Sequence, residues 1–194
     1  MKFTKIPTNT FQNIVSNAGV VLKNFDVAKG AYDDADLLGA TSGGVNFTAV
    51  PTFTDYGEDI DNCPKNMKEL KKLESWEVKL TGTFVTMTLE MAKILAAAAD
   101  AADSESKVTP RNEISSADFN DLWFVCDYSE KNGATNGGLV AIKVINALST
   151  GGLSIQSTDK AKGKFAFEFT GHVSMDAQDI VPFEIYVKAG TDES

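Results

Sequence analysis

Apolar and polar residues alternate along several segments of this chain, and the alternation restricts the fold more than any other feature. Successive side chains of a β-strand point to opposite faces, so the pattern predicts strands with one face on a core and the other in water. It is clearest over 76–84, 165–170 and 181–188, whose regularly spaced apolar residues are Trp76, Val78, Leu80, Phe84, Phe165, Phe167, Phe169, Val181, Phe183, Ile185 and Val187. Half-buried strands of this kind are typical of antiparallel sheets.

Further strands and one helix complete the expected fold. The other predicted strands are 18–25, 45–53, 122–127 and 139–145. A helix is predicted over 89–102, because Thr88 is a suitable N-cap and the charged residues that follow form one stripe at helical spacing. We therefore expect a single domain over 1–194 that is mainly β, a β-sandwich or small barrel of antiparallel strands with one packed α-helix.

Charge balance and rare side chains exclude several functional classes. The 194 residues include 18 basic and 27 acidic ones, for a net charge of −9, whereas domains that grip nucleic acid are usually basic. A single histidine, His172, excludes a multi-histidine metal site and is expected on the surface. Two cysteines, Cys63 and Cys126, exclude a zinc ribbon and are expected to be reduced and packed. We predict no metal and no cofactor.

Known catalytic and ion-binding motifs are also missing. No Gly-x-Ser-x-Gly motif occurs, and the glycine-rich segment 133–138 lacks the lysine and following helix of a phosphate loop, so we interpret it as a turn. The acidic stretch 55–62 fails the spacing of a calcium loop, because Pro64 and Leu70 stand where glycine and glutamate are needed. No catalytic residue is predicted.

Nothing in the sequence indicates a leader or a membrane span. The segment 1–20 lacks the apolar core of a secretory signal, and no run of about 20 apolar residues occurs. We therefore expect synthesis in the cytoplasm and no membrane partner. The end of the chain, 190–194, is expected to fray.

The segment 57–73 is long for a connection between two strands, since hairpin loops usually have about 2–5 residues. Its acidic residues come first and its lysines last, which suits head-to-tail contact between identical subunits. The predicted interface residues are Glu58, Asp59, Ile60, Asp61, Lys65, Met67, Lys68, Leu70, Lys71 and Lys72.

Several segments, which together cover most of the chain, carry a resemblance to a known family. They are 38–44 (LGATSGG), 54–66 (TDYGEDIDNCPKN), 75–78 (SWEV) with the TGTF that follows shortly after, 163–172 (GKFAFEFTGH) and 181–187 (VPFEIYV). The chain resembles the major tail proteins, or tail tube proteins, of long-tailed, non-contractile bacteriophages and prophages of Gram-positive bacteria. None of these segments is a catalytic signature, so the resemblance implies a structural protein and not an enzyme.

The resemblance implies a specific assembly. Tail tube subunits are β-sandwiches flanked by a helix, and they form hexameric rings whose inner strands join around a pore. Rings stack into a tube, and a long loop, matched here by 57–73, reaches the adjacent ring. The implied partners are the chain itself and the tail initiator (distal tail), tape-measure and tail terminator proteins. The implied location is the virion tail, after assembly in the host cytoplasm.

Genomic DNA would pass through such a tube without specific binding. Acidic groups on the wall would repel DNA phosphates within a Debye length of about 8–10 Å. Candidate pore-facing acids on polar strand faces are Glu77, Glu168 and Glu184. Two alternatives stay open: a β-sandwich module that binds carbohydrate on a virion surface or in an adhesin, and a small enzyme that uses two carboxylates. The carbohydrate module predicts exposed aromatic residues in one groove.

Overall fold

The computed structural model describes residues 5–7, 10, 13–128 and 137–190. The chain is mainly β, as predicted, with antiparallel strands and one α-helix, α1 (Leu89–Leu95). The strands are β1 (Val15–Leu22), β2 (Thr41–Asp55), β3 (Lys71–Phe84), β4 (Ala99–Ala102), β5 (Lys107–Pro110), β6 (Asn120–Tyr128), β7 (Gly138–Ser149), β8 (Phe165–Thr170) and β9 (Phe183–Lys188). The glycine-rich turn predicted at 133–138 and the tail at 190–194 lie largely outside the described residues.

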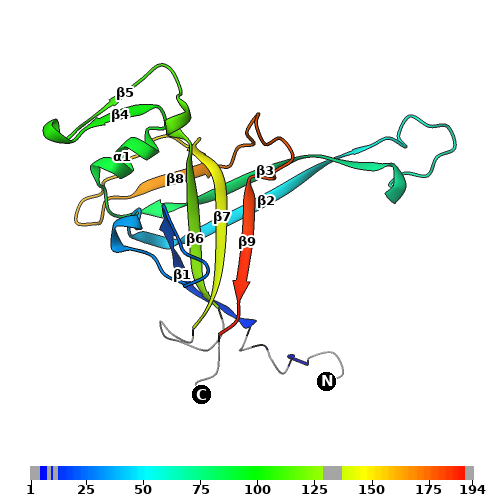
Figure 1. Ribbon diagram of the computed structural model, residues 1–194, viewed down its shortest axis with the longest axis horizontal. Coiled ribbons are helices and arrows are strands. Elements are labelled where there is room, and N and C mark those ends of the chain that lie inside the picture. Colours follow the sequence, from blue (N-terminus) through cyan, green and yellow to red (C-terminus); the bar gives the residue numbers. More distant parts are fainter. Residues whose placement is uncertain (1–4, 8–9, 11–12, 129–136, 191–194) are drawn as a thin grey trace.

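Strand β7 belongs to two sheets at once. Most of it pairs with β6 on one side and β9 on the other, while Leu148 and Ser149 at its end pair with β8. The strand order is β1-β6-β7-β8-β3-β2, with β9 beside β7. In Figure 1, β1, β6, β7 and β9 stand upright, and β2, β3 and β8 run across them. We call these the upright sheet and the cross sheet.

A bulge in β7 marks the passage from one sheet to the other. The β6–β7 register shifts there, because one residue of β6 but two of β7 lie between the Leu122–Val144 pair and the next. Asn146 has a φ of 49°, in the left-handed region that asparagine tolerates better than most residues. Its backbone N–H donates to Asp121 Oδ1 at 3.0 Å. Because bulges bend a strand and increase its twist, the end of β7 turns into the cross sheet.

The main core fills the space between the two sheets and beneath α1. Phe84 and Phe167 stack with their ring centroids 4.3 Å apart. The Ser149 hydroxyl donates to the Leu95 carbonyl at 3.0 Å and ties the helix to β7. The buried residues of this core are Val21, Leu38, Val78, Leu80, Phe84, Met91, Leu95, Leu122, Phe124, Cys126, Val144, Ala147, Phe167 and Phe169. The predicted alternation in β3 and β8 therefore identified part of the core correctly.

The helix is shorter than predicted. The Thr88 hydroxyl accepts the Met91 N–H at 3.1 Å, which confirms the N-cap, but α1 ends at Leu95 and does not continue to residue 102. Ala97 has a φ of 63°, which ends the helical path, and the alanine-rich segment after it forms β4 against β5. Alanine favours a helix locally. The pairing with β5 is a contact between distant segments, and it outweighs that local preference.

The upright sheet extends beyond the region that the cross sheet covers. Phe183 of β9 packs on the rings of Phe47 and Trp76, at centroid distances of 5.6 and 5.4 Å. The next two residues on the same face, Ile185 and Val187, are 52% and 59% exposed. The prediction that this whole apolar row lies on a core is therefore wrong within one subunit, because no strand of the cross sheet lies over the second half of β9 (Figure 1).

A second, smaller core lies on the outer face of the upright sheet. Phe25 and Tyr186 flank the Trp123 ring, at centroid distances of 5.8 and 5.7 Å. Leu22 and Ala141 are buried with them. The segment 23–37, which connects β1 to β2, contributes Phe25 and covers part of this face, although its sequence has no periodic pattern that predicts such a cover.

An ion-pair cluster connects the end of β5 to the start of β6. The Arg111 guanidinium contacts the buried carboxylate of Asp118 and, at 3.1 Å, the exposed carboxylate of Asp100. Asp118 also accepts the Ser115 backbone N–H at 2.8 Å. Burial raises the pKa of Asp118, but the hydrogen bond from Ser115 and the hydrogen bond and charge of Arg111 outweigh burial, so the pKa of this carboxyl lies below its ordinary value.

Replacing Asp118 with alanine should lower the free energy of unfolding by about 1–3 kcal/mol at neutral pH, because Arg111 and the Ser115 N–H lose their buried acceptor. A carboxyl whose pKa is lowered by folding stabilises the protein above its unfolded-state pKa of about 3.9, and this contribution disappears as the pH falls through the folded value. Urea unfolding of wild type and Asp118→Ala, from pH 7 downward, should show a difference that shrinks with acidification.

The control is Asp100→Ala, which removes the exposed partner of the same guanidinium and should cost less than about 1 kcal/mol. Equal losses for the two variants, or a loss for Asp118→Ala that stays constant down to pH 2, would contradict this account.

Candidate assembly surfaces

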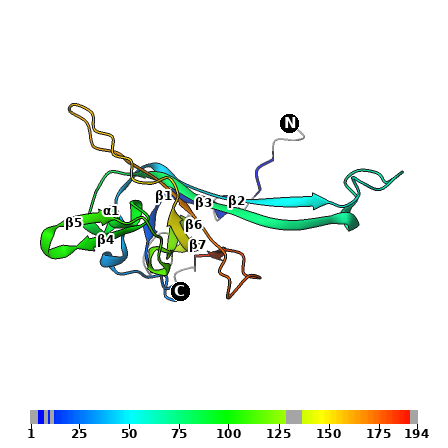
Figure 2. The ribbon, with the colours of Figure 1, turned by 90° about the horizontal axis from the view of Figure 1, so that it is seen from above.

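Strands β2 and β3 form a hairpin that reaches far beyond the body of the molecule (Figures 1 and 2). Pairing continues outward as far as Asp55 and Lys71. The connection between the strands therefore spans 56–70 and is shorter than the predicted loop at 57–73, because Lys71, Lys72 and Leu73 are strand residues. We call residues 50–77 the arm. These strand ends are rich in threonine and lysine and lie outside the core, so they lack the apolar alternation that predicts a strand.

An apolar row follows one face of the arm. Pro51 pairs with Trp76, and Phe53 pairs with Leu73. Strand alternation places both pairs on the face that packs on the core nearer the body. A shift in register at Glu74 keeps Leu73 on this face. Phe53 and Leu73 are nevertheless 53% and 44% exposed, so the row continues past the core that it helps to form.

The tip of the arm is a folded turn. Asp55 accepts the backbone N–H of Gly57 at 2.9 Å with one carboxylate oxygen and that of Asn66 at 3.0 Å with the other. The Lys71 ammonium donates to Asn66 Oδ1 at 2.8 Å. Gly57 is buried, and a side chain added there would begin 3.1 Å from the Cys63 sulfur. These contacts close the turn at its base and fill its interior.

The tip and the start of β3 carry all the predicted interface residues. Leu70 is half-buried, and the Met67 sulfur lies 3.5 Å from that of Cys63. The exposed members are Glu58, Asp59, Ile60, Asp61, Lys65, Met67, Lys68, Lys71 and Lys72. Sequence reasoning did not select Phe53, Tyr56 or Leu73, which are the other large apolar residues exposed on the arm beside Val50. The continued alternation of β2 past Pro51 is the signal that could have identified Phe53.

Two of the three predicted pore-facing acids share one surface. Glu77 and Glu168 lie 2.7 and 3.8 Å from the Lys79 ammonium, on the outer face of the cross sheet. The hydrogen bond to Glu77 and then the charge of Glu168 raise the pKa of Lys79 above its ordinary value. The strand register places six threonines on this same face, which we call the threonine face: Thr48, Thr52, Thr54, Thr81, Thr83 and Thr170.

Glu184 lies elsewhere. It pairs with Lys143 across β9 and β7, and its carboxylate accepts a hydrogen bond from the Tyr186 hydroxyl. These residues belong to the outer face of the upright sheet, near the second core. The structure therefore does not bring the three predicted acids onto one wall, because they come from two sheets that face different directions.

Three strands of the seven-stranded sheet have an open edge within the described residues. β1 and β2 end the strand order on its two sides, and β9 pairs with β7 alone. Open edges expose backbone N–H and C=O groups that readily pair with another chain. The edges of β2 and β9 adjoin the two uncovered apolar rows.

The remaining candidate residues from the sequence occupy structural positions. His172 is half-buried: its ring edge packs on Phe119, Nδ1 lies 3.2 Å from the Asn146 carbonyl oxygen, and the rest of the residue is partly exposed. Cys126 is buried and Cys63 half-buried, both as free thiols. In the described ranges, no group of three histidine, cysteine or acidic side chains is placed to hold a metal ion.

The features described above are apolar and charged surfaces, and none of them is a cluster of catalytic side chains. No helix in the described part of the chain is long and apolar enough to cross a bilayer. Comparison with protein-family models and with curated proteins finds no match to this sequence. A functional proposal therefore depends on the arm, the apolar rows and the threonine face.

Removing the Asp55 carboxylate should loosen the tip without unfolding the body. In Asp55→Ala the N–H groups of Gly57 and Asn66 lose their acceptors, while both core clusters keep all their residues. We expect trypsin to cut at Lys65 or Lys68 at least about tenfold faster, since local opening becomes easier, with little change in Tm. Asp59→Ala is the matched control, because that carboxylate has no partner among the described residues. Equal cleavage rates for the two variants would show that Asp55 does not hold the tip.

Proposed function

We propose that this chain is the tail tube subunit of a long-tailed, non-contractile phage or prophage. Copies of it would form stacked rings, hexameric as the family resemblance implies, around a hollow conduit for genome delivery. The role is structural and uses no cofactor. Besides further copies of itself, its partners are the tail initiator, tape-measure and tail terminator proteins. The subunit is assembled in the host cytoplasm and resides in the virion tail.

The two uncovered apolar rows carry the proposal. Phe53 and Leu73 continue the core face of the cross sheet, and Ile185 and Val187 continue the core face of the upright sheet. Full burial of a large apolar side chain is worth about 1.5–3 kcal/mol. Neither row has a cover within the described part of the chain, so a neighbouring copy that brings one row onto the other would stabilise both.

The arm suits contact between rings. It extends the cross sheet far beyond the body of the molecule (Figure 2). Its folded tip has acids first and lysines later along the turn. The tip of the arm would contact a different surface on the next copy, so the contact is heterologous. Heterologous contacts that run along an axis add copies without forming a closed ring. A stack of rings is the expected product.

The threonine face is the best candidate for the pore wall. It is an ordered strand surface of hydroxyl groups, carboxylates and ion-paired lysines, and it includes the exposed apolar residue Val50. Its two lysines are ion-paired: Lys79 contacts Glu77 and Glu168, and Lys72, beside Thr54, lies 3.4 Å from Glu74. Neither ammonium group is therefore free of a carboxylate partner. Tight phosphate binding needs several free cationic groups. DNA would slide along such a wall, which agrees with the acidic net charge of −9.

The carbohydrate-binding alternative predicts aromatic rings exposed in a groove. Trp123 is only 9% exposed and packs between Phe25 and Tyr186, and Trp76 packs on Phe183. This alternative also assigns no role to the arm. The described contacts therefore favour the tube subunit over the carbohydrate module.

Replacing residues 53–74 with Asn-Gly should give a folded subunit that does not elongate. Thr52 and Ser75 are paired, so a two-residue turn can close the shortened hairpin there. Neither core cluster includes any residue of 53–74. We expect circular dichroism and Tm close to wild type, whereas negative-stain microscopy of concentrated protein should show hollow rods for wild type alone. Wild type that stays monomeric at every concentration and salt would count against the proposal.

A finer version tests the apolar row itself. Phe53→Ser with Leu73→Ser should raise the protein concentration needed for rods at least about tenfold, which corresponds to about 1.4 kcal/mol per added subunit. The control is Thr52→Ala with Thr54→Ala, on the opposite face of the same strand. Rods that form equally well from the two double variants would exclude the row as an assembly contact.

A further inference from the structure

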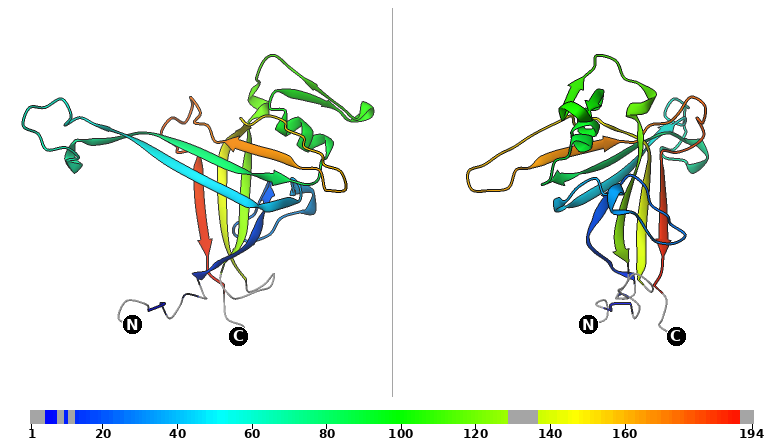
Figure 3. Two further views of the ribbon diagram at one scale, coloured as in Figure 1. Left: turned by 180° about the vertical axis from the view of Figure 1, so that it is seen from behind. Right: turned by 60° about the vertical axis from the view of Figure 1, so that its left-hand side comes forward.

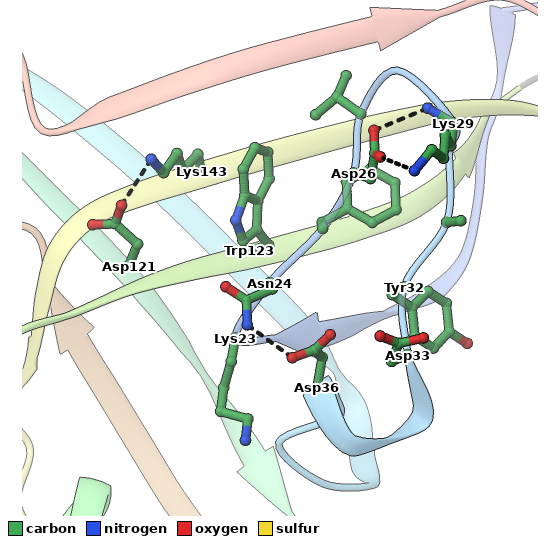
Figure 4. A pocket seen from close by; sticks show the side chains of 13 residues that line it. Lys23, Asn24, Asp26, Lys29, Tyr32, Asp33, Asp36, Asp121, Trp123 and Lys143 are labelled. Atoms are coloured by element: carbon green, nitrogen blue, oxygen red, sulfur yellow. Dashed lines mark hydrogen bonds and ion pairs between the residues drawn. The ribbon is translucent and has the colours of Figure 1, made fainter.

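An open pocket of about 730 Å³ lies between the segment 23–36 and the outer face of the upright sheet (Figure 4). The Trp123 ring lies at its centre, and the Lys143 ammonium is 5.7 Å from the ring centroid. Asp121 holds this ammonium at 2.7 Å, and Asp26 pairs with Lys29 at 3.2 Å. A concave site of this volume is large enough for several side chains, and its lining mixes apolar with charged residues.

One rim of the pocket keeps negative charge. Asp33 lines the pocket, and Asp34 follows it just outside the lining; both are exposed, and neither has an ion-pair partner among the described residues. Asp36, next to them, accepts a hydrogen bond from the Asn24 amide at 2.9 Å (Figure 4). The pocket therefore combines a partly apolar lining, in which Tyr32 is the exposed ring, with an acidic rim, and it fits an occupant that carries apolar and cationic side chains together.

The connection between β7 and β8 carries both kinds of side chain. Gln156 and Lys164 exchange two backbone hydrogen bonds, of 2.9 and 2.8 Å, and these close the segment 151–164 into a narrow projection. We call this projection the knob. Its exposed apolar residues are Leu153 and Ile155, and its exposed lysines, which have no ion-pair partner in the described part of the chain, are Lys160, Lys162 and Lys164.

The knob and the pocket lie on opposite sides of the subunit. In the right-hand view of Figure 3 the knob projects to one side, and the segment 23–37 projects to the other. The view from above in Figure 2 agrees. The knob therefore cannot fill the pocket of its own chain, but copies placed side by side bring one knob to the next pocket.

We propose that the knob of each subunit docks in the pocket of its neighbour within the ring. Leu153 and Ile155 cover the apolar part of the lining around Tyr32, and the lysines face Asp33 and Asp34. Charge complementarity sets the register of such a contact and speeds its formation. Because knob and pocket are different surfaces on opposite sides, the contact is heterologous and closes into a ring if its rotation allows. The inference rests on the proposed function and specifies which lateral surfaces meet.

Zero-length cross-linking of the wild-type protein tests the contact directly. A water-soluble carbodiimide joins a carboxylate to a lysine amine with loss of water, and only when the two groups touch. In an equal mixture of ¹⁴N- and ¹⁵N-labelled protein, mixed-isotope peptides report links between chains. We expect such links from the knob lysines to Asp33 or Asp34. Links confined to single chains, or links that join this rim to Lys65 and Lys68 of the arm, would overturn the proposal.

The same measurement separates this inference from the proposed function. Rods without knob-to-rim links would retain the tube and reject this lateral contact. Knob-to-rim links in a protein that never forms rods or rings would retain the contact and reject the tube. Absence of both would reject both, and presence of both supports both.

Charge exchange gives an independent test. Lys160→Glu with Lys162→Glu, or Asp33→Lys with Asp34→Lys, should each raise the concentration needed for assembly at least about tenfold. A chain that carries all four changes should assemble within about threefold of wild type, because each reversed knob then meets a reversed rim. Lys5→Glu with Lys107→Glu, which lowers the net charge as much as the knob variant does but lies outside both surfaces, should behave as wild type. Circular dichroism verifies folding, and failure of the four-change chain to recover would overturn the proposal.

Discussion

The fold depends on one strand that takes part in two sheets. β7 pairs with β6 and β9 along most of its length, and its last residues pair with β8 after the bulge at Asn146. The side chain of Asp121 stabilises the bulge by accepting the Asn146 N–H. Because the strand bends there, the two sheets cross steeply, and their inner faces overlap only near the crossing (Figure 1). The main core, the position of α1 and the direction of the arm all follow from that geometry.

Limited overlap of the sheets leaves each with an apolar surface of its own. The row on β9 and the row on the arm have the same alternation as the core strands, but they lie beyond the crossing and are exposed. In a protein that acts alone, such rows would be a cost in solubility. Both rows lie beside open strand edges, that of β2 and that of β9. The apolar faces that form the core of one subunit can therefore continue into a contact with a neighbouring subunit of the proposed assembly.

Local patterns predicted much of the fold, and contacts between distant segments account for the rest. The strict alternation of β3 and β8 and the cap at Thr88 were visible, because each depends on a few adjacent residues. The end of the helix was not, since the alanines after Leu95 pair with a strand further along. The arm was partly visible as an unusual charged segment. The length of the arm, the pocket and the knob depend on strand pairing and packing between distant segments, which a periodic sequence pattern does not predict.

The arm also influences how growth would begin in the proposed tube. A two-stranded ribbon is only marginally stable in water, and no residue of 53–74 belongs to a core cluster. Two free subunits that meet bury only one contact between them, whereas a subunit that joins an existing end contacts a complete ring surface. Growth of this kind has a slow nucleation phase and rapid extension. Dispersed subunits would persist until a template supplies the first layer, which gives the cell control over when and where a tail starts.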